Sequence, residues 1–432
     1  GRSIERSMDQ RGRLTSVKEG TVELTNFVYD DADRLITKSY PVNGTETNYT
    51  YDSNDRITSM ISSPGNFLKS VFTYDVNGNK LTENKLHRPD QSEQYAYDDD
   101  YRLTSFKRGV MSGNSIPSPS QQINYNYDPL GNRTTVVENS QTTTYATNVM
   151  NGYTSINGQS TISLQYDSKG NIINDGTFTN TYDTQNRLIN VNGGAVATYK
   201  YDALGRRIQK NVGGTITSFA YSGIHEIENL DATNTVTSSY VYGGGFDNIL
   251  SAELNGADYF YNRNGIGSVN AITSSNGTVL ERYEYDAFGS EQLFDGNYNA
   301  LATSGIGNHI LYTGRTKDSE IDKYYYRARH YSDYNGRFEQ RDPLQYFAGD
   351  MNLYAYVFNA PTRFVDAFGL NANDCTKPYE GGGAAGTVND ALGYRADDVA
   401  EKLAGKAKNA RDIVADLDKL VAQSNIEEAI DE

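Results

Sequence analysis

The chain has 432 residues, of which 37% are apolar, and it carries a formal net charge of -16 with a pI near 4.8. This acidity argues against a nucleic-acid partner, because phosphate binding needs a basic face. The single cysteine, Cys375, excludes an intrachain disulfide, and no apolar run approaches the roughly 18 residues that a transmembrane helix needs.

Aromatic residues are abundant, with 35 Tyr and 15 Phe but no Trp. Disordered chains are poor in aromatics, so this chain is expected to fold. Forty Gly against nine Pro indicate many tight turns, and together these features favour an extended all-β protein. The sequence opens GRSIERSMDQRGRL, in mid-pattern and without a starting Met, which we interpret as a piece of a longer protein.

One motif repeats along most of the chain. It consists of Tyr-Asp, two to four residues rich in Asn, Gly and Asp, then Arg or Lys and an aliphatic residue. Copies follow one another about every 20 residues, with insertions. They begin at Tyr29, Tyr51, Tyr74, Tyr97, Tyr127, Tyr166, Tyr182, Tyr201 and Tyr285, with a degenerate first copy at Met8-Asp9 and a further one near Tyr145.

Each repeat predicts a β-hairpin. Residues before Tyr-Asp alternate, as in Asn48-Tyr49-Thr50-Tyr51, which is the period of a strand with one buried face. Asn, Gly and Asp after it favour a turn, and the aliphatic residues that follow predict the return strand. Since one hairpin is marginally stable, successive hairpins are expected to pair into one long sheet.

The turn after Tyr74 has a second interpretation as a calcium loop, because Asp75, Asn77 and Asn79 are spaced like the first ligands of one. Such a loop also needs flanking helices and a Glu at its twelfth position, where this chain has Leu86. The pattern therefore favours a plain turn.

These repeats, followed by the block of residues 311–370, resemble the RHS/YD-repeat family of bacterial polymorphic toxins, toxin-complex C components and teneurins. Residues 257–289 resemble the family's segment before Tyr-Asp-Ala-Phe-Gly, with Asn264 and Ile266 as departures. The core signature of the family is matched by Gly314, Arg315, Tyr325, Arg327, Arg329, Gly336, Arg337, Phe338, Pro343, Asn352, Leu353, Tyr354, Asn359, Pro361 and Gly369.

The resemblance implies a cocoon of β-strands in three parts. Residues 1–254 would be hairpin repeats, 255–370 the RHS-associated core that closes the shell, and 371–432 a variable C-terminal segment. In many relatives the core also cuts the chain after a signature like Asp-Pro-x-Gly-Leu. Here it reads Asp366-Ala367-Phe368-Gly369-Leu370, which predicts cleavage between Leu370 and Asn371. Ala367 replaces the proline that would fix the backbone there.

The implied chemistry is that of an aspartyl protease, in which two carboxylates near one peptide bond share a proton. The candidates are Asp342 and Asp366, with Arg341 stabilising a carboxylate or the oxyanion and Asp350 as a third acid. The competing interpretation makes both Asp turn residues. For Arg327, Arg329 and Arg337, we favour structural pairing with buried carboxylates or stacking on Tyr.

No other catalytic set or cofactor site is apparent. The four histidines, His87, His225, His309 and His330, are scattered, and a single Cys past the core makes a metal site or a Cys–His pair unexpected. Gly243-Gly244-Gly245 follows a predicted strand but precedes no helix, so it is interpreted as a bend. We expect no cofactor and no metal.

The last part of the chain differs in character. Residues 380–386 read EGGGAAG, a flexible linker, and residues 398–421 carry apolar side chains at helical spacing after Asp397, a candidate cap. Three interpretations remain open: a plug or cargo held by the shell, a small catalytic toxin, or a truncated remnant.

The first hypothesis is therefore a secreted or cell-surface bacterial toxin shell, whose cargo is its own C-terminal segment. A secretion-system or toxin-complex component and an immunity protein are the partners that the resemblance implies. The alternative is a teneurin-like adhesion or carbohydrate-binding module. A freestanding hydrolase is disfavoured by the lack of a second catalytic set.

Overall fold

The computed structural model describes residues 2–370 and 373–374. These residues are built almost entirely of antiparallel strands joined in sequence order. The predicted all-β spiral of hairpins is confirmed. The predicted linker and helix, and Asn371 at the predicted cut, lie outside the described residues.

The first sheet holds fifteen strands, each paired with its neighbours in the sequence. They are β1 (Ile4–Met8), β2 (Leu14–Glu19), β3 (Val22–Tyr29), β4 (Leu35–Tyr40), β5 (Thr45–Tyr51), β6 (Ile57–Ser63), β7 (Leu68–Tyr74), β8 (Lys80–Lys85), β9 (Glu93–Tyr97), β10 (Leu103–Arg108), β11 (Gln121–Tyr127), β12 (Arg133–Glu138), β13 (Gln141–Thr147), β14 (Tyr153–Asn157) and β15 (Thr161–Ser163). The short 3-10 helix η1 (Pro89–Gln91) joins β8 to β9.

A two-stranded sheet of β16 (Gln165–Tyr166) and β17 (Ile172–Asn174) leads to a second large sheet of thirteen strands. The second large sheet contains β18 (Asn180–Tyr182), β19 (Leu188–Val191), β20 (Ala197–Tyr201), β21 (Arg207–Val212), β22 (Thr215–Ser222), β23 (His225–Leu230), β24 (Val236–Tyr242), β25 (Ile249–Leu254), β26 (Ala257–Arg263), β27 (Val269–Ser274), β28 (Val279–Tyr285), β29 (Glu291–Asp295) and β30 (Ala300–Leu301). The 3-10 helix η2 (Asn192–Gly194) lies between β19 and β20.

The last described part of the chain, from residue 312 onward, forms a small unit that is called the closing unit below. Its four-stranded sheet consists of β31 (Thr316–Asp318), β32 (Lys323–Tyr326), β33 (Arg329–Ser332) and β34 (Arg337–Phe338). Around it lie the 3-10 helices η3 (Tyr312–Gly314), η4 (Gln345–Ala348) and η5 (Val357–Asn359), and a pair of strands, β35 (Phe364–Val365) and β36 (Asn373–Asp374).

The repeat motif forms the turn that ends each hairpin. Asp30 Oδ1 accepts hydrogen bonds from the amides of Ala32 and Arg34, at 3.0 and 2.9 Å, and Asp30 Oδ2 accepts one from the Arg34 side chain at 2.7 Å. The Tyr hydroxyl reaches back to the preceding repeat, as Tyr51 does to the Leu35 carbonyl at 2.7 Å. This explains why the motif requires Tyr rather than Phe.

Asp75 makes the same turn as the other repeats. Its Oδ1 accepts from the amides of Asn77 and Asn79, and its Oδ2 accepts from the Asn79 side chain. Both carboxylate oxygens of Asp75 therefore accept hydrogen bonds within the turn. The structure confirms the plain turn that the sequence favoured over a calcium loop.

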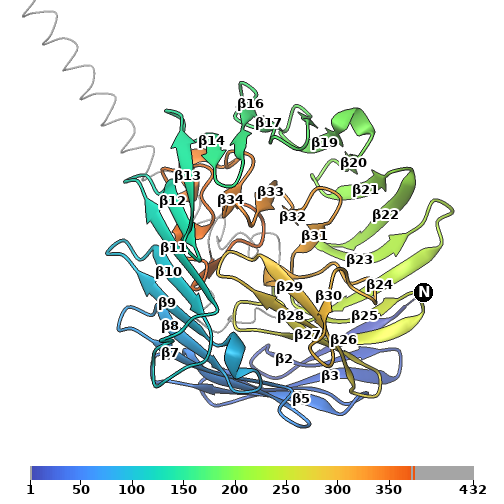
Figure 1. The fold of residues 1–432 in the computed structure, drawn as a ribbon. Helices are drawn as coiled ribbons and strands as arrows, with labels where there is room; N and C mark the ends of the chain where they lie inside the picture. The colour runs from blue at the N-terminus through green and yellow to red at the C-terminus, as the bar shows by residue number, and fades with distance from the viewer. Residues whose placement is uncertain (1, 371–372, 375–432) are drawn as a thin grey trace, which may run out of the picture.

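The ribbon of strands curls until its beginning meets its later part. Figure 1 shows the colours running round the molecule from blue to yellow, with the second sheet returning beside the N-terminus and the orange strands lying inside. At this overlap Val17 and Phe27 pack with Val241 and Phe260. The Tyr40 hydroxyl donates to the Tyr261 carbonyl at 2.7 Å. The two large sheets together are called the wall. The wall is two layers thick where β24–β26 cover β2–β4.

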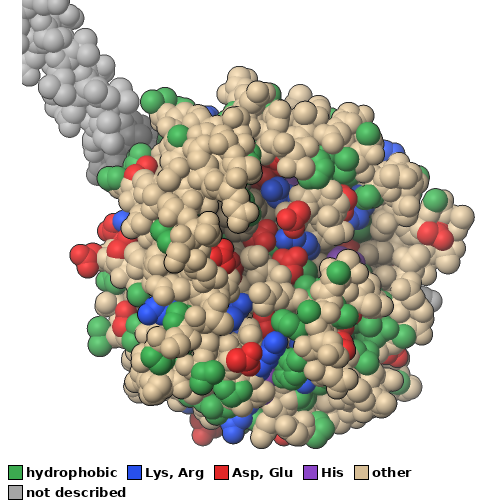
Figure 2. Space-filling model, in the orientation of Figure 1, with side chains coloured by type: hydrophobic (Ala, Val, Ile, Leu, Met, Phe, Trp, Pro, Cys, Tyr) green, Lys and Arg blue, Asp and Glu red, His purple; other side chains and the backbone are tan. Residues whose placement is uncertain are grey.

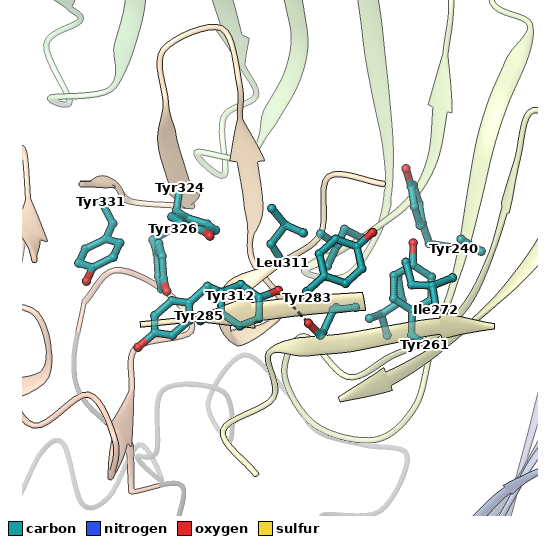
Figure 3. Close-up of a cluster of buried hydrophobic side chains, with 14 of the residues drawn as sticks. Tyr240, Tyr261, Ile272, Tyr283, Tyr285, Leu311, Tyr312, Tyr324, Tyr326 and Tyr331 are labelled. Carbon is teal, nitrogen blue, oxygen red and sulfur yellow. Dashed lines mark hydrogen bonds between the residues drawn. The ribbon is translucent and has the colours of Figure 1, made fainter. Parts of the chain in front are cut away.

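Tyrosines from the second sheet and from the closing unit form the largest buried cluster (Figure 3). Their hydroxyls find backbone acceptors: Tyr331 donates to the Phe288 carbonyl at 2.6 Å and Tyr312 to the Ala287 carbonyl at 3.0 Å. A ring can therefore fill the core without leaving its hydroxyl unpaired. This accounts for a stable interior in a chain of modest apolar content.

Candidate active site

Two predicted acids, Asp342 and Asp366, are brought together by an arginine. One terminal nitrogen of Arg329 lies 2.7 Å from Asp342 Oδ2 and 3.3 Å from Asp366 Oδ2. All three residues are buried, at 3%, 6% and 2% exposed for Arg329, Asp342 and Asp366. Arg329 thus brings two buried carboxylates onto one cation, and a pair of carboxylates in one site can share a proton.

Asp366 is held by a turn of the repeat type. Its Oδ1 accepts from the amides of Phe368 and Leu370, at 3.1 and 3.0 Å. The signature Asp366–Leu370 is therefore one more copy of the hairpin turn, with Val365 standing where a repeat has Tyr. Asp366 is both a turn residue and a partner of Asp342, so the two interpretations of the sequence are compatible.

The same turn also occurs at positions that lack the Tyr-Asp motif. In each case a side-chain oxygen of Asp or Asn accepts from the amides two and four residues later. These turns begin at Asp9, Asn148, Asp231, Asn264 and Asp295. The sequence pattern missed most of them because the position before the turn varies.

Asp342 follows β34 in an irregular loop. Its Oδ1 accepts from the Leu344 amide at 2.8 Å, and its own amide donates to the Leu353 carbonyl at 2.8 Å. Burial raises the pKa of Asp342 to about 6, against the opposing charge of Arg329, and the negative charge of Asp366 adds to the rise. Asp342 can therefore hold a proton up to about pH 6, well above the range of an ordinary aspartate.

Arg329 also contacts the backbone of the predicted cleavage segment. Its Nε donates to the Gly369 carbonyl at 2.6 Å, and another of its nitrogens donates to the Leu353 carbonyl at 3.2 Å. Its guanidinium lies 3.6 Å from the centre of the Phe338 ring. Arg329 therefore pairs with buried carboxylates, as expected from the sequence. Those carboxylates are the two candidate catalytic acids. The sequence did not indicate that Arg329 would join them.

Arg341 and Asp350 make other contacts than the pair on Arg329, although burial raises the pKa of Asp350 and the charge of Arg329 opposes that rise. The Nε of Arg341 and the Tyr354 hydroxyl occupy the space that a side chain at Gly170 would need. Asp350 Oδ1 accepts from the Asn352 amide at 2.8 Å. Among the described residues, no ion pair joins Arg341 to Asp342 or Asp366. Arg329 is the arginine that contacts both acids, and the role predicted for Arg341 stays a prediction.

Several signature residues attach the closing unit to the wall turns. Arg337 donates to the Asn151 carbonyl and to Asn132 Oδ1, both at 3.0 Å. The Asn359 side chain donates to the Gly131 carbonyl at 3.0 Å. These contacts hold the loops that carry Asp342 and Asp366 against the β11–β12 and β13–β14 turns.

Charged side chains also gather on the surface of the molecule. On the face shown in Figure 2, acidic and basic side chains gather around a central hollow. In the part of the chain that the structure describes, no group of three or more His, Cys, Asp and Glu side chains is placed to hold a metal ion. The described residues also contain no helix that is long and apolar enough to cross a membrane.

Residues 64–361 match the family described as Teneurin YD-shell, and residues 29–66 match the family described as RHS Repeat. The chain is 35% identical over 393 residues to the tRNA3(Ser)-specific nuclease WapA of Bacillus spizizenii, which covers 78% of this chain and 16% of that protein. It is 25% identical over 388 residues to the Double-stranded DNA deaminase toxin A of Burkholderia cenocepacia, covering 82% of this chain and 23% of that protein. The chain thus spans less than a quarter of these relatives.

Among solved structures, the chain is similar to that of TcdB2-TccC3, with a TM-score of 0.68 and 21% identity over 86% of this chain and 21% of that chain. It is also similar to the Photorhabdus luminescens Tc holotoxin pore, with a TM-score of 0.69 and 20% identity over 86% of this chain and 20% of that chain. These likenesses show a shared fold.

Proposed function

The chain belongs to the teneurin YD-shell and RHS-repeat family, and on this premise we propose that it closes a toxin shell, encloses its own C-terminal segment and releases it by cutting after Leu370. The shell would span hairpin repeats in residues 1–254 and the closing core in 255–370, with residues 371–432 as cargo.

The observation that carries the proposal is the placement of Arg329. It contacts both Asp342 and Asp366, and it also donates to the carbonyl of Gly369, the residue before Leu370. The candidate acids are thus attached to the backbone they would cut. One guanidinium neutralises one negative charge, which favours a pair that carries a single proton.

The reaction would follow the scheme of two carboxylates and one water. The ionised Asp366 accepts a proton from water, whose oxygen bonds to the carbonyl carbon of Leu370. Asp342 donates its proton to the amide nitrogen of Asn371 as the bond between Leu370 and Asn371 breaks. The products are a carboxylic acid at Leu370, which passes its proton to solvent or to the new amine, and an amine at Asn371. The pair still holds one proton, now on Asp366, and its transfer to Asp342 restores the starting state.

A denaturing gel of the purified full chain, together with measurement of the intact masses, tests this proposal. The wild-type chain should appear as two fragments that end at Leu370 and begin at Asn371. Asp342→Asn and Asp366→Asn should each leave the chain whole, because an amide cannot serve as acid or base.

Asp350→Asn is the matched control. Asp350 lies in the same block, burial raises its pKa as well, and its Oδ1 accepts one backbone amide. This variant should cleave like the wild type. An uncut wild-type chain that is folded would overturn the proposal, and so would normal cleavage in both Asp342→Asn and Asp366→Asn.

The partners proposed are a delivery component and an immunity protein. The family membership and the toxin name of the Burkholderia cenocepacia relative support these partners and a secreted shell. For residues 371–432 a plug or cargo role is favoured over catalysis, because the segment contains no His and no recognisable catalytic set. Expressing this segment in bacterial cytosol tests it: growth arrest would favour a catalytic toxin.

The match to the teneurin YD-shell supports a second candidate, an adhesion or carbohydrate-binding module without catalysis. The exposed rings of Tyr101, Tyr334 and Tyr346 would then offer an apolar face and a hydroxyl to a ligand. Glycan-array binding by the full chain, together with an uncut wild-type protein, would favour this alternative over the releasing shell.

A further inference from the structure

A loop of the wall reaches the candidate cleavage segment. It spans residues 243–248, between β24 and β25, and it carries Phe246 and Asp247. Asp247 is 5% exposed and has a left-handed backbone with φ of 50°. Asp tolerates this conformation in turns, and Asp33, Asp55 and Asp322 adopt it too. The place of Asp247 is fixed instead by its burial and its ion pairs.

Asp247 links two arginines of the closing unit. Its Oδ1 lies 2.9 Å from a terminal nitrogen of Arg315, and its Oδ2 lies 3.1 Å from one of Arg327. Burial alone would raise the pKa of Asp247, but Arg315 and Arg327 lower it to about 2. Asp247 is thus ionised at every pH at which the protein is expected to work.

Arg327 carries the contact onward to the cleavage segment. The nitrogen that pairs with Asp247 Oδ2 also donates to the Ala367 carbonyl. Its guanidinium lies 4.9 Å from the centre of the Phe368 ring. Phe246 meets the same ring edge to face, with centroids 5.0 Å apart. The wall loop therefore contacts two consecutive residues of the segment. Phe246 contacts Phe368 directly, and Asp247 is linked to Ala367 through Arg327.

Close backbone contacts leave this arrangement little freedom. A Cβ at Gly314 would lie 2.6 Å from the Asp247 carbonyl oxygen, and one at Gly369 would lie 2.6 Å from the Tyr326 carbonyl oxygen. The wall loop therefore abuts the closing unit, and the cleavage turn abuts β32. A shift of the loop would be transmitted to residues 367–370.

From these contacts we infer that Asp247 is a positioning residue for self-cleavage, and that the 243–248 loop permits the cut only after the wall has curled closed. The inference rests on the proposed function. The strands on either side of the loop supply Val241 and Leu250, which pack against Val17 and Phe27 at the N-terminal overlap. Asp247 thus reaches its place only when β2–β4 and β24–β26 have met, which couples release of the cargo to its enclosure.

Cleavage during refolding of the full chain tests this. Protein unfolded in denaturant is diluted, and the uncut fraction is followed by gel and intact mass. Asp247→Asn should slow cleavage about 100-fold, because misplacing a reacting group by about an ångström has an effect of that size. Phe246→Ala, which leaves the ion pairs intact, should slow it about 10-fold. Fragments ending at residues other than Leu370 should appear in both, which a loss of stability alone would not produce.

Asp318→Asn is the matched control, since it breaks another buried ion pair between wall and closing unit, that with Arg207. Cleavage in this variant should be much faster than in Asp247→Asn once both are folded, as judged by circular dichroism. Equal slowing in the two would overturn the inference, and so would wild-type rate and cut position in both Asp247→Asn and Phe246→Ala. A wild-type chain that folds and stays whole would instead overturn the proposed self-cleavage.

Discussion

Arg207 and Asp318 form a doubly hydrogen-bonded ion pair across 111 residues of sequence, with contacts of 2.5 and 3.0 Å. Arg207 lies on β21 of the wall and Asp318 at the end of β31, and they are 1% and 0% exposed. The pair fastens the closing unit to the wall. Arg207 also lies 4.1 Å from the centre of the Tyr325 ring, so its guanidinium is enclosed on that side.

Asp318→Ala should therefore lower the free energy of unfolding by about 3–5 kcal/mol, because it leaves the buried charge of Arg207 unpaired. Replacing both partners, as Arg207→Met with Asp318→Leu, should recover most of that loss. Urea denaturation of the variants measures both effects. A double variant as unstable as the single one would contradict this explanation.

The rate of self-cleavage should fall as the pH rises above about 6. Burial raises the pKa of Asp342 to about 6, and above that value the protonated form needed to protonate the leaving nitrogen decreases about tenfold per pH unit. Refolding the chain at a series of pH values and timing the cut gives the profile. A rate that increases steadily from pH 6 to 8 would contradict the assigned role.

The same shift in pKa affects stability. In the unfolded chain Asp342 loses its proton above about pH 4, whereas in the folded protein it keeps the proton up to about pH 6. Its contribution to the free energy of unfolding is therefore fully present below about pH 4 and is lost as the pH rises through about 6.

Gly336→Ala should destabilise the fold more than an alanine at an open glycine. A Cβ at Gly336 would lie 1.8 Å from a terminal nitrogen of Arg133, whose guanidinium is packed 4.2 Å from the Phe288 ring centre. Overpacking of this kind costs about 1–3 kcal/mol. Gly223→Ala is the control, because Gly223 has a similar φ of 59° with nothing within 4 Å. Equal losses in thermal denaturation would show that only the backbone strain matters.

Ala367→Pro should be accepted and should not slow cleavage. The equivalent position of the Asp128 turn already holds Pro129, and that turn has the same pattern, with Leu130 and Asn132 amides donating to Asp128 Oδ1. A compatible proline stabilises by about 0.4–1 kcal/mol, because it restricts the unfolded chain. Thermal denaturation in the Asp366→Asn background and cleavage timing in the wild-type background measure the two effects. A lower unfolding temperature would show that the two turns differ.

The hairpin wall could be predicted because its determinants are local. Asp30 contacts the amides two and four residues ahead, and Tyr51 reaches the neighbouring strand, so each repeat carries its own turn and its own link to the next. The family signature also placed Asp342 and Asp366 in the candidate site. Why they meet could not be predicted, because their partner Arg329 is one of several arginines in the block.

By itself, then, the sequence determined the all-β hairpin repeats and, through the family resemblance, the two candidate acids. Only the tertiary structure decided that Arg329 rather than Arg341 joins those acids, and that Asp247 in the wall reaches the cleavage segment through Arg327. The reason is physical. Pairing between neighbouring strands is specified within some 20 residues, whereas the curl of the whole ribbon determines which distant side chains meet at its closed end.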